Sequence, residues 1–256
     1  MGAMSGWELL AILVAGMAAG LINALAGGGT LVTFPTLVAV GIPPIAANVT
    51  STVALCPGYL GATFAQWADI KAQKHYWFWV LPAAVVGGLI GALLLLQTDE
   101  KVFTALVPWL ILLAALLLAL QNPVRDWLKA RLQNPEHAHL PVWWVVPLVL
   151  LGAIYGGYFG AGLSVIILAV LALVLEGTLT QLNALKQAVA FCVNVAAAVF
   201  FLFSGKVVWL AAAIMAVGAL TGGMLGGKLA GKINPNTLRI LVVSLGIIIA
   251  VLYWVK

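Results

Sequence analysis

The sequence predicts an all-helical membrane protein that crosses the bilayer many times. Of its 256 residues, 64% are hydrophobic and 7% are charged, with a mean hydropathy of +1.15. Ordinary soluble domains carry about 25% charged residues. The apolar residues form separate segments, and two short ones adjoin glycine clusters. We therefore expect an all-α polytopic membrane protein with two inverted-topology repeats, glycine-broken or re-entrant helices, and eight to ten membrane segments.

Two of the apolar segments are too short to cross a membrane alone. The second and seventh have about 15 residues, whereas a helix needs about 20 to span the hydrocarbon core. The glycines Gly27, Gly28 and Gly29 open the second segment, and Gly160 and Gly162 open the seventh. The ten segments are 7–26, 28–42, 45–66, 76–96, 102–120, 143–160, 161–176, 182–203, 207–228 and 237–255.

The two halves of the chain repeat one arrangement. In each half a glycine cluster is followed by a short apolar run, a break and a helix that carries polar residues. Gly29 precedes Asn48 by 19 positions, and Gly162 precedes Asn183 by 21. This correspondence indicates a duplication with five segments in each half. Because five is odd, the second half should be inverted relative to the first.

The basic residues support this division. With ten crossings, one side of the membrane collects eight Lys and Arg residues and the other collects three, which fits the positive-inside bias. We expect a first repeat at 1–120, a cytoplasmic linker at 121–141 and a second repeat at 142–256, with both chain ends outside. The larger group is Lys71, Lys74, Arg125, Lys129, Arg131, Lys228, Lys232 and Arg239; the smaller is Lys101, Lys206 and Lys256.

Two other topologies remain open. If each glycine-broken pair formed one crossing, giving eight in all, the basic residues would divide seven to four, a weaker bias. If the broken pairs were re-entrant hairpins, every connection would keep its side. Charge therefore does not separate re-entrant hairpins from ten full crossings.

The glycine clusters are candidates for a binding site. Unpaired backbone groups in lipid cost several kcal/mol each, so a helix break must be buried in protein or line a cavity. Helix ends at such a break present oriented N–H groups that suit an anionic ligand. The alternative is close packing of helices through small residues. The candidate residues at the breaks are Asn23, Gly27, Gly28, Gly29, Thr30, Gly160 and Gly162.

Polar residues on the following helices are further candidates. Lys186 is the one Lys or Arg that falls inside an apolar segment away from its ends, so its charge needs compensation. An anionic substrate could supply it, as could an ion pair with Glu176, and a lysine near the membrane surface is a third alternative. Asn183, Gln187 and Asn194 share a helical face with Lys186. Their counterparts in the first half are Asn48, Thr50, Ser51 and Thr52, which could instead bridge helices.

Several other activities find no support in the sequence. Cys56 and Cys192 lie in apolar runs, which favours small buried side chains over a disulfide or a metal site. The stretch 222–229 resembles a phosphate-binding loop but ends in leucine and lacks a preceding strand, so we expect no nucleotide site. Gly218, Gly222 and Gly226 in the same region predict a helix-packing ladder instead. We expect no enzyme activity, no cofactor, no metal and no nucleic-acid partner.

Three stretches resemble the sulfite/organosulfonate exporter (TauE/SafE) family of bacterial membrane permeases. They are LINALAGGGTLVTFPTLVAVGIPPIAANVTST (21–52), LNALKQAVAFCVNVAAAVFFLFSGKVVW (182–209) and GALTGGMLGGKLAGKINPNTLRILVV (218–243). The resemblance implies secondary transport of small sulfur-containing anions such as sulfite, sulfonates or sulfoacetate across the bacterial cytoplasmic membrane. It also implies coupling to an ion gradient, carried by H⁺ or Na⁺. A passive anion channel is the alternative, and an oligomer is compatible with either.

Overall fold

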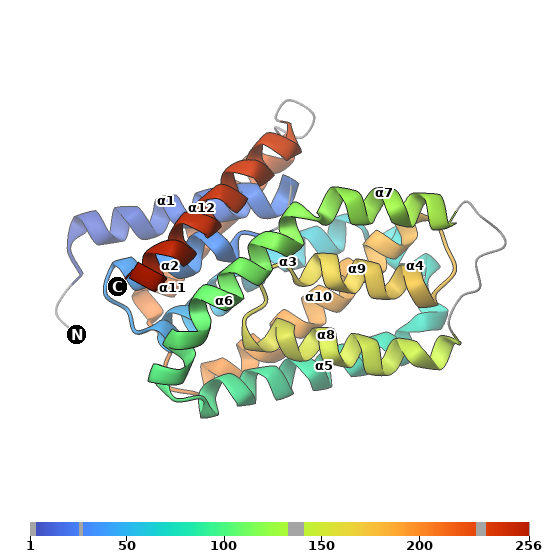
Figure 1. Cartoon of the computed structure of the whole chain (residues 1–256), viewed down its shortest axis with the longest axis horizontal. Coiled ribbons are helices and arrows are strands. Elements are labelled where there is room, and N and C mark those ends of the chain that lie inside the picture. Colours follow the sequence, from blue (N-terminus) through green and yellow to red (C-terminus); the bar gives the residue numbers. More distant parts are fainter. Residues whose placement is uncertain (1–3, 26–27, 133–140, 229–233, 256) are drawn as a thin grey trace.

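All the elements of the described chain are helices. The computed structural model describes residues 4–25, 28–132, 141–228 and 234–255, and within these ranges it has no strand. Figure 1 shows an elongated bundle in which α1, α2, α11 and α12 occupy one end while α4, α7 and α9 occupy the other. The predicted all-α fold is confirmed.

Each of the ten predicted apolar segments corresponds to a helix. The first half contains α1 (Gly6–Leu25), α2 (Thr30–Ala39), α3 (Pro44–Ala65), α5 (Lys74–Gln97) and α6 (Glu100–Ala119). The second half contains α8 (Val145–Tyr158, preceded by the 3₁₀ turn η1 at Val142–Trp144), α9 (Leu163–Val174), α10 (Leu179–Leu202), α11 (Trp209–Lys228) and α12 (Pro235–Val255).

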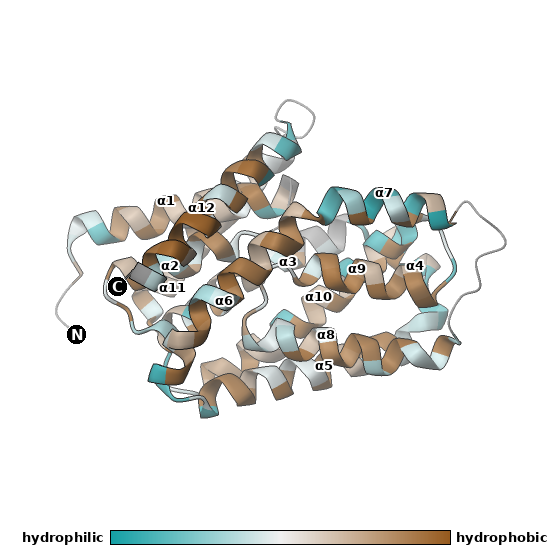
Figure 2. Ribbon diagram, in the orientation of Figure 1, coloured by the Kyte–Doolittle hydropathy of each residue, from teal (hydrophilic) through white to brown (hydrophobic). Residues whose placement is uncertain are grey.

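In the part of the chain that the structure describes, two additional helices lie in the connections. The short α4 (Trp67–Ala72) follows α3, and α7 (Gln121–Leu132) forms the first part of the expected linker. Figure 2 shows α7 as the most hydrophilic of the labelled helices, whereas the helices around it are mostly apolar. A polar helix between two apolar halves is compatible with a linker outside the membrane core.

Helix lengths distinguish full spans from partial ones. Among the described residues, six helices are long and apolar enough to cross a membrane. By contrast, α2 has 10 residues and α9 has 12, which correspond to about 15 and 18 Å of helix. Because the hydrocarbon core is about 30 Å thick, neither helix spans it alone.

Tryptophans mark the ends of several apolar helices. Trp7 lies near the start of α1, Trp209 is the first residue of α11 and Trp254 is the next-to-last residue of α12. All three side chains are more than half exposed. Tryptophan is enriched at membrane–water interfaces because its ring is apolar and its N–H is polar. These positions fit a protein whose apolar outer surface faces lipid.

Glycines allow the breaks between α1 and α2 and between α8 and α9. Gly28, Gly160 and Gly162 have φ values of +92°, +78° and +80°, a region that residues with a Cβ rarely adopt. The freed backbone groups find partners: the Tyr155 hydroxyl donates to the carbonyl of Ala161 at 2.6 Å. The breaks are therefore built features of the fold.

The two halves pack on each other through glycines. A Cβ on Gly218 or Gly222 of α11 would overlap the backbone of Leu13 or Met17 in α1, so the helices touch along the predicted ladder. The pair α5 and α8 is equally close, with Gly157 against the backbone of Gly88. The predicted packing ladder is confirmed.

The contacts between helices are reciprocal in the two halves. Helix α1 packs on α11 as α8 packs on α5, and α3 packs on α11 as α10 packs on α5. Helices α3 and α10 pack on each other, as do α6 and α12. If each helix is replaced by its counterpart in the other half, the same set of packed pairs results, as a twofold relation would require. The inverted orientation of the repeats stays a prediction.

Adjacent glycines in α11 should respond differently to a methyl group. We expect Gly222→Ala to destabilise the protein by about 1–3 kcal/mol, because the new Cβ overpacks against Met17. Gly223→Ala should have little effect on stability, since the nearest atom to its Cβ would be the Gly20 carbonyl oxygen at 3.8 Å. Melting temperatures of the two purified variants test this, and equal values would contradict the close approach of α1 and α11.

Candidate functional site

A pocket of about 440 Å³ lies between α1, α3, α10 and α11. Most of its lining is apolar or glycine, and the polar side chains are three amides and one phenol. The polar residues are Asn23, Tyr59, Gln66 and Gln187. None of the residues that line it is acidic. Such a cavity offers hydrogen-bond donors and excludes repelling carboxylates, which suits a small anion.

A proline and a glycine weaken α3 where it lines the pocket. Pro57 lies inside the helix and has no N–H to donate to the carbonyl one turn earlier, while Gly58 has no side chain. Both residues line the pocket, and Tyr59 follows directly. The wall therefore combines a weakened stretch of helix with a large side chain that carries a hydroxyl group.

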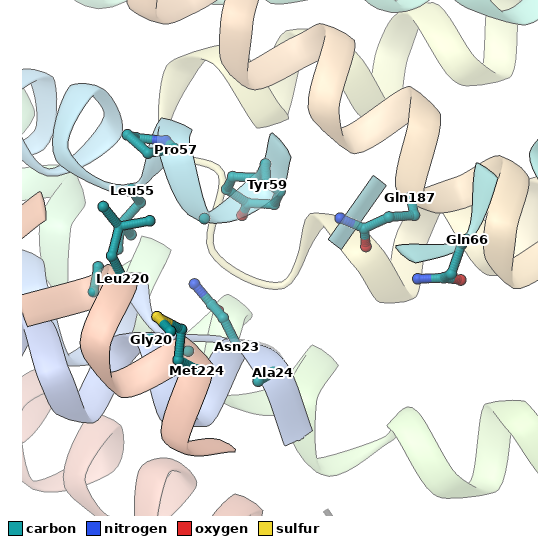
Figure 3. A pocket seen from close by; sticks show the side chains of 13 residues that line it. Gly20, Asn23, Ala24, Leu55, Pro57, Tyr59, Gln66, Gln187, Leu220 and Met224 are labelled. Atoms are coloured by element: carbon teal, nitrogen blue, oxygen red, sulfur yellow. The ribbon is translucent and has the colours of Figure 1, made fainter. Parts of the chain in front are cut away.

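Asn23 connects the pocket to the first helix break. Its Oδ1 accepts a hydrogen bond of 2.8 Å from the N–H of Gly29. Figure 3 shows its amide nitrogen pointing into the cavity below Tyr59, with Gln187 and Gln66 farther along. The amide oxygen of Asn23 thus stabilises the helix break, and its amide nitrogen is available to donate to a ligand.

Lys186 reaches the pocket through two amides. Its Nζ donates to Oδ1 of Asn183 at 2.9 Å, and Nδ2 of Asn183 donates to Oε1 of Gln66 at 3.2 Å. The positive charge of Arg125, in α7, also acts on Lys186. The predicted polar face of α10 is thus joined to the pocket wall.

The structure contradicts the proposed ion pair with Glu176. That side chain is exposed beyond the end of α9, and no ion pair joins it to Lys186. Within the described ranges, the ion pair that does form links Lys129 to Asp126 at 3.5 Å. Glu176 precedes the turn into α10, so the chain carries its carboxylate to the surface, and no carboxylate in the described part of the chain pairs with Lys186.

The other two polar residues of α10 also approach the cavity. Gln187 lines it directly. Asn194 lies two turns later, donates to the Ala190 carbonyl at 2.7 Å and interacts with the Tyr59 hydroxyl. Of the four predicted residues of this helix face, Gln187 lines the pocket and Asn183 and Asn194 contact residues that line it, while Lys186 is bonded to Asn183.

The predicted polar residues of α3 do not line the pocket. Asn48 donates to the Tyr158 carbonyl at 2.8 Å, Thr50 accepts from the Val208 N–H at 3.0 Å, and Ser51 is 2.6 Å from Thr33. Thr52 donates to the carbonyl of Asn48 at 3.0 Å. In this structure these side chains bridge helices or bond within α3, and they do not line the pocket.

Apart from Asn23, the described break residues are separate from the pocket lining. Gly28 lies against Leu118 and Gly162 against Leu117, so both breaks rest on the last turns of α6. Gly160 lies in the turn between α8 and α9, and Thr30 begins α2. Gly27 lies outside the described residues.

Sequence reasoning missed Tyr59 and Gln66. Both belong to the predicted segment 45–66, where the proline and glycine at positions 57 and 58 were the available signal of an interrupted helix. The cysteines agree with their predicted role, because Cys56 and Cys192 are free and partly buried. In the described part of the chain, no three His, Cys, Asp or Glu side chains cluster as metal ligands would.

The chain matches known membrane proteins over most of its length. A probable membrane transporter protein of Haemophilus influenzae is 30% identical over 220 residues, covering 85% of this chain and 83% of that protein. The probable membrane transporter protein ORF9 of a Sinorhizobium species is 30% identical over 250 residues, covering 96% and 92%. YfcA of Escherichia coli K12, another probable membrane transporter protein, is 25% identical over 214 residues, covering 80% and 74%.

No solved structure matches the chain. The family model for the sulfite exporter TauE/SafE matches residues 12–253, nearly the whole sequence. Together with the apolar helices, this match shows a multi-pass membrane transporter protein. The chain belongs to the TauE/SafE sulfite exporter family.

Proposed function

We propose that this protein is a secondary transporter of small sulfur-containing anions, of the sulfite, sulfonate or sulfoacetate class, in the bacterial cytoplasmic membrane. The observation that carries the proposal is Lys186. It lies in an apolar helix, has no carboxylate partner among the described residues, and is bonded through Asn183 to the pocket residue Gln66. An intramembrane charge requires compensation, and an anion in the pocket would supply it.

The chemistry of the pocket supports an oxyanion. Amide N–H groups and a phenol hydroxyl donate to oxygen atoms, and the bonds strengthen when the acceptor is charged. The description of the matching family as sulfite exporters supports sulfur as the central atom. We infer that the donors replace part of the hydration of the anion.

Transport is driven in this proposal by a gradient. The stretch that resembles a phosphate-binding loop is helical from Gly222 to Lys228 and packs on α1, so it forms no nucleotide loop. The two halves would rock against each other and expose the pocket alternately to the two sides. The reciprocal contacts of the helices support such a motion.

The distribution of basic residues indicates which side of the membrane the pocket faces in this conformation. Asn23 is near the end of α1, and Gln66 follows the end of α3. The connection after α3 carries Lys71 and Lys74. By the positive-inside rule this side is cytoplasmic, so we assign the conformation as inward-facing.

Uptake into proteoliposomes tests the proposal. Sulfite, sulfoacetate, taurine and sulfate should be compared with a carboxylate control. We expect saturable movement of at least one sulfur-containing anion that depends on an imposed ion gradient. Passive, non-saturable conductance would favour an anion channel. The absence of both binding and flux for every sulfur-containing anion would refute the proposed substrate class.

Asn23→Asp tests whether the pocket binds anions. The carboxylate keeps an acceptor for the Gly29 N–H but replaces the pocket-facing donor with negative charge. We expect anion affinity to fall roughly tenfold, since a like charge in a partly solvated site costs on the order of 1–2 kcal/mol. Binding is measured by calorimetry alongside the melting temperature. Unchanged affinity in a stable variant would place the anion elsewhere.

A further inference from the structure

Asn48 holds a buried oxygen atom that lacks a hydrogen-bond partner. Its side chain is 1% exposed, and its Nδ2 donates to the carbonyl of Tyr158 at 2.8 Å. Because the nitrogen is fixed by that acceptor, the orientation of the amide is fixed too. Its Oδ1 is buried without a partner among the described residues. A buried acceptor left unpaired destabilises the folded protein, so its retention calls for a function.

The hydroxyl groups of Thr33, Ser51 and Thr52 make other hydrogen bonds, and none of them is bonded to this oxygen. Thr52 donates to the backbone carbonyl of Asn48. Thr33 points toward the carbonyls of Gly29 and Thr30, at 3.4 and 3.5 Å. The Thr33 and Ser51 hydroxyl groups are 2.6 Å apart, and one donates to the other. Each hydroxyl has one hydrogen, so the network presents oxygen acceptors.

The second helix break adds more acceptors. Tyr158 is the last residue of α8, where the final carbonyls have no N–H partners in the helix and the dipole is negative. Asn48 of α3 is held directly against this helix end. Neutral amide, hydroxyl and carbonyl oxygens beside a helix C-terminus match the way that broken-helix transporters bind Na⁺.

We propose that Asn48 Oδ1 and the carboxyl end of α8 form a Na⁺ site, which supplies the coupling ion of the proposed transporter. The role of Na⁺ as the coupling ion rests on the proposed function, whereas Na⁺ binding is testable by itself. An amide does not take up a proton in the physiological range, so this site selects a metal cation over H⁺. Asn48 and the pocket residue Tyr59 lie on the same helix, α3, on either side of Pro57.

The test measures the stability of the full-length protein in detergent. The melting temperature is followed during titration with NaCl, with KCl and choline chloride at equal ionic strength as comparisons. We expect a saturable increase with Na⁺ that the other two cations do not reproduce, because a ligand that binds only the folded state stabilises it. Equal responses to the three salts would overturn the proposal.

Two substitutions at Asn48 should act in opposite directions. Asn48→Leu removes the ligand and should weaken the apparent Na⁺ affinity about tenfold or more. Asn48→Asp adds a negative charge and should strengthen the Na⁺ response while lowering stability in its absence. The opposite signs keep the test informative if the leucine variant folds poorly. A Na⁺ response that is unchanged in both variants would place the ion elsewhere.

Gln73 provides the matched control. It is another buried amide, 3% exposed, whose oxygen has no partner among the described residues. It lies in the turn between α4 and α5, away from the break between α8 and α9. Gln73→Leu should leave the Na⁺ response intact. Loss of the response in this variant as well would show a general effect of removing buried amides and would overturn the assignment.

The two proposals fail separately. Anion binding at the pocket without any Na⁺ effect would remove the Na⁺ site and leave the proposed transporter standing. Na⁺ binding at Asn48 without any binding of sulfur-containing anions would support the cation site and remove the proposed substrate class.

Discussion

Replacing Gly29 by valine should abolish transport while the protein still inserts into the membrane. A Cβ at this position would lie 2.7 Å from the Ala19 carbonyl oxygen and 2.8 Å from Nδ2 of Asn23. The added side chain must displace the Asn23 amide, which both holds the break and faces the pocket. We therefore expect loss of anion flux in proteoliposomes and anion affinity reduced by more than tenfold, about 1.4 kcal/mol or more.

Gly6 supplies the control for this substitution. It lies at the start of α1, and no atom lies within 4 Å of its ideal Cβ. Gly6→Val should transport normally at the same level of membrane insertion. Normal uptake by the Gly29 variant would mean that the break tolerates a side chain and that Asn23 has no part in binding.

Lys186→Met should weaken anion binding about ten- to hundredfold. The estimate follows from about 1.5–3 kcal/mol for a hydrogen bond to a charged group, whether the ammonium contacts the anion or acts through Asn183. Folding should suffer little, because methionine removes a charge that no carboxylate balances within the ranges that the structure describes. Affinity by calorimetry and melting temperature measure the two effects separately.

Three comparisons accompany this variant. Lys206→Met removes an exposed lysine from the connection between α10 and α11 and should leave affinity unchanged. Glu176→Gln should also be neutral, and the double variant with Lys186→Met should show no recovery. Rescue of transport by the double variant would restore the ion-pair interpretation and end the assignment of Lys186 to the anion.

The sequence determined the elements of this protein because their signals are local. Hydropathy placed all ten apolar helices, since each residue carries its own transfer free energy. The helix breaks at Gly28, Gly160 and Gly162 followed from the glycine clusters, because glycine adopts the positive φ angles found there at low cost. Gly218 and Gly222 predicted close helix packing from their four-residue spacing alone.

Only the tertiary structure decided which polar groups meet. Asn183 bonds to Gln66, 117 positions away, and Asn48 bonds to the carbonyl of Tyr158, 110 positions away. Glu176 was a candidate partner of Lys186 by sequence distance, yet the turn before α10 leaves it exposed. A helical face can be derived from one segment, but its neighbour depends on how every helix packs, and that free energy belongs to the whole bundle.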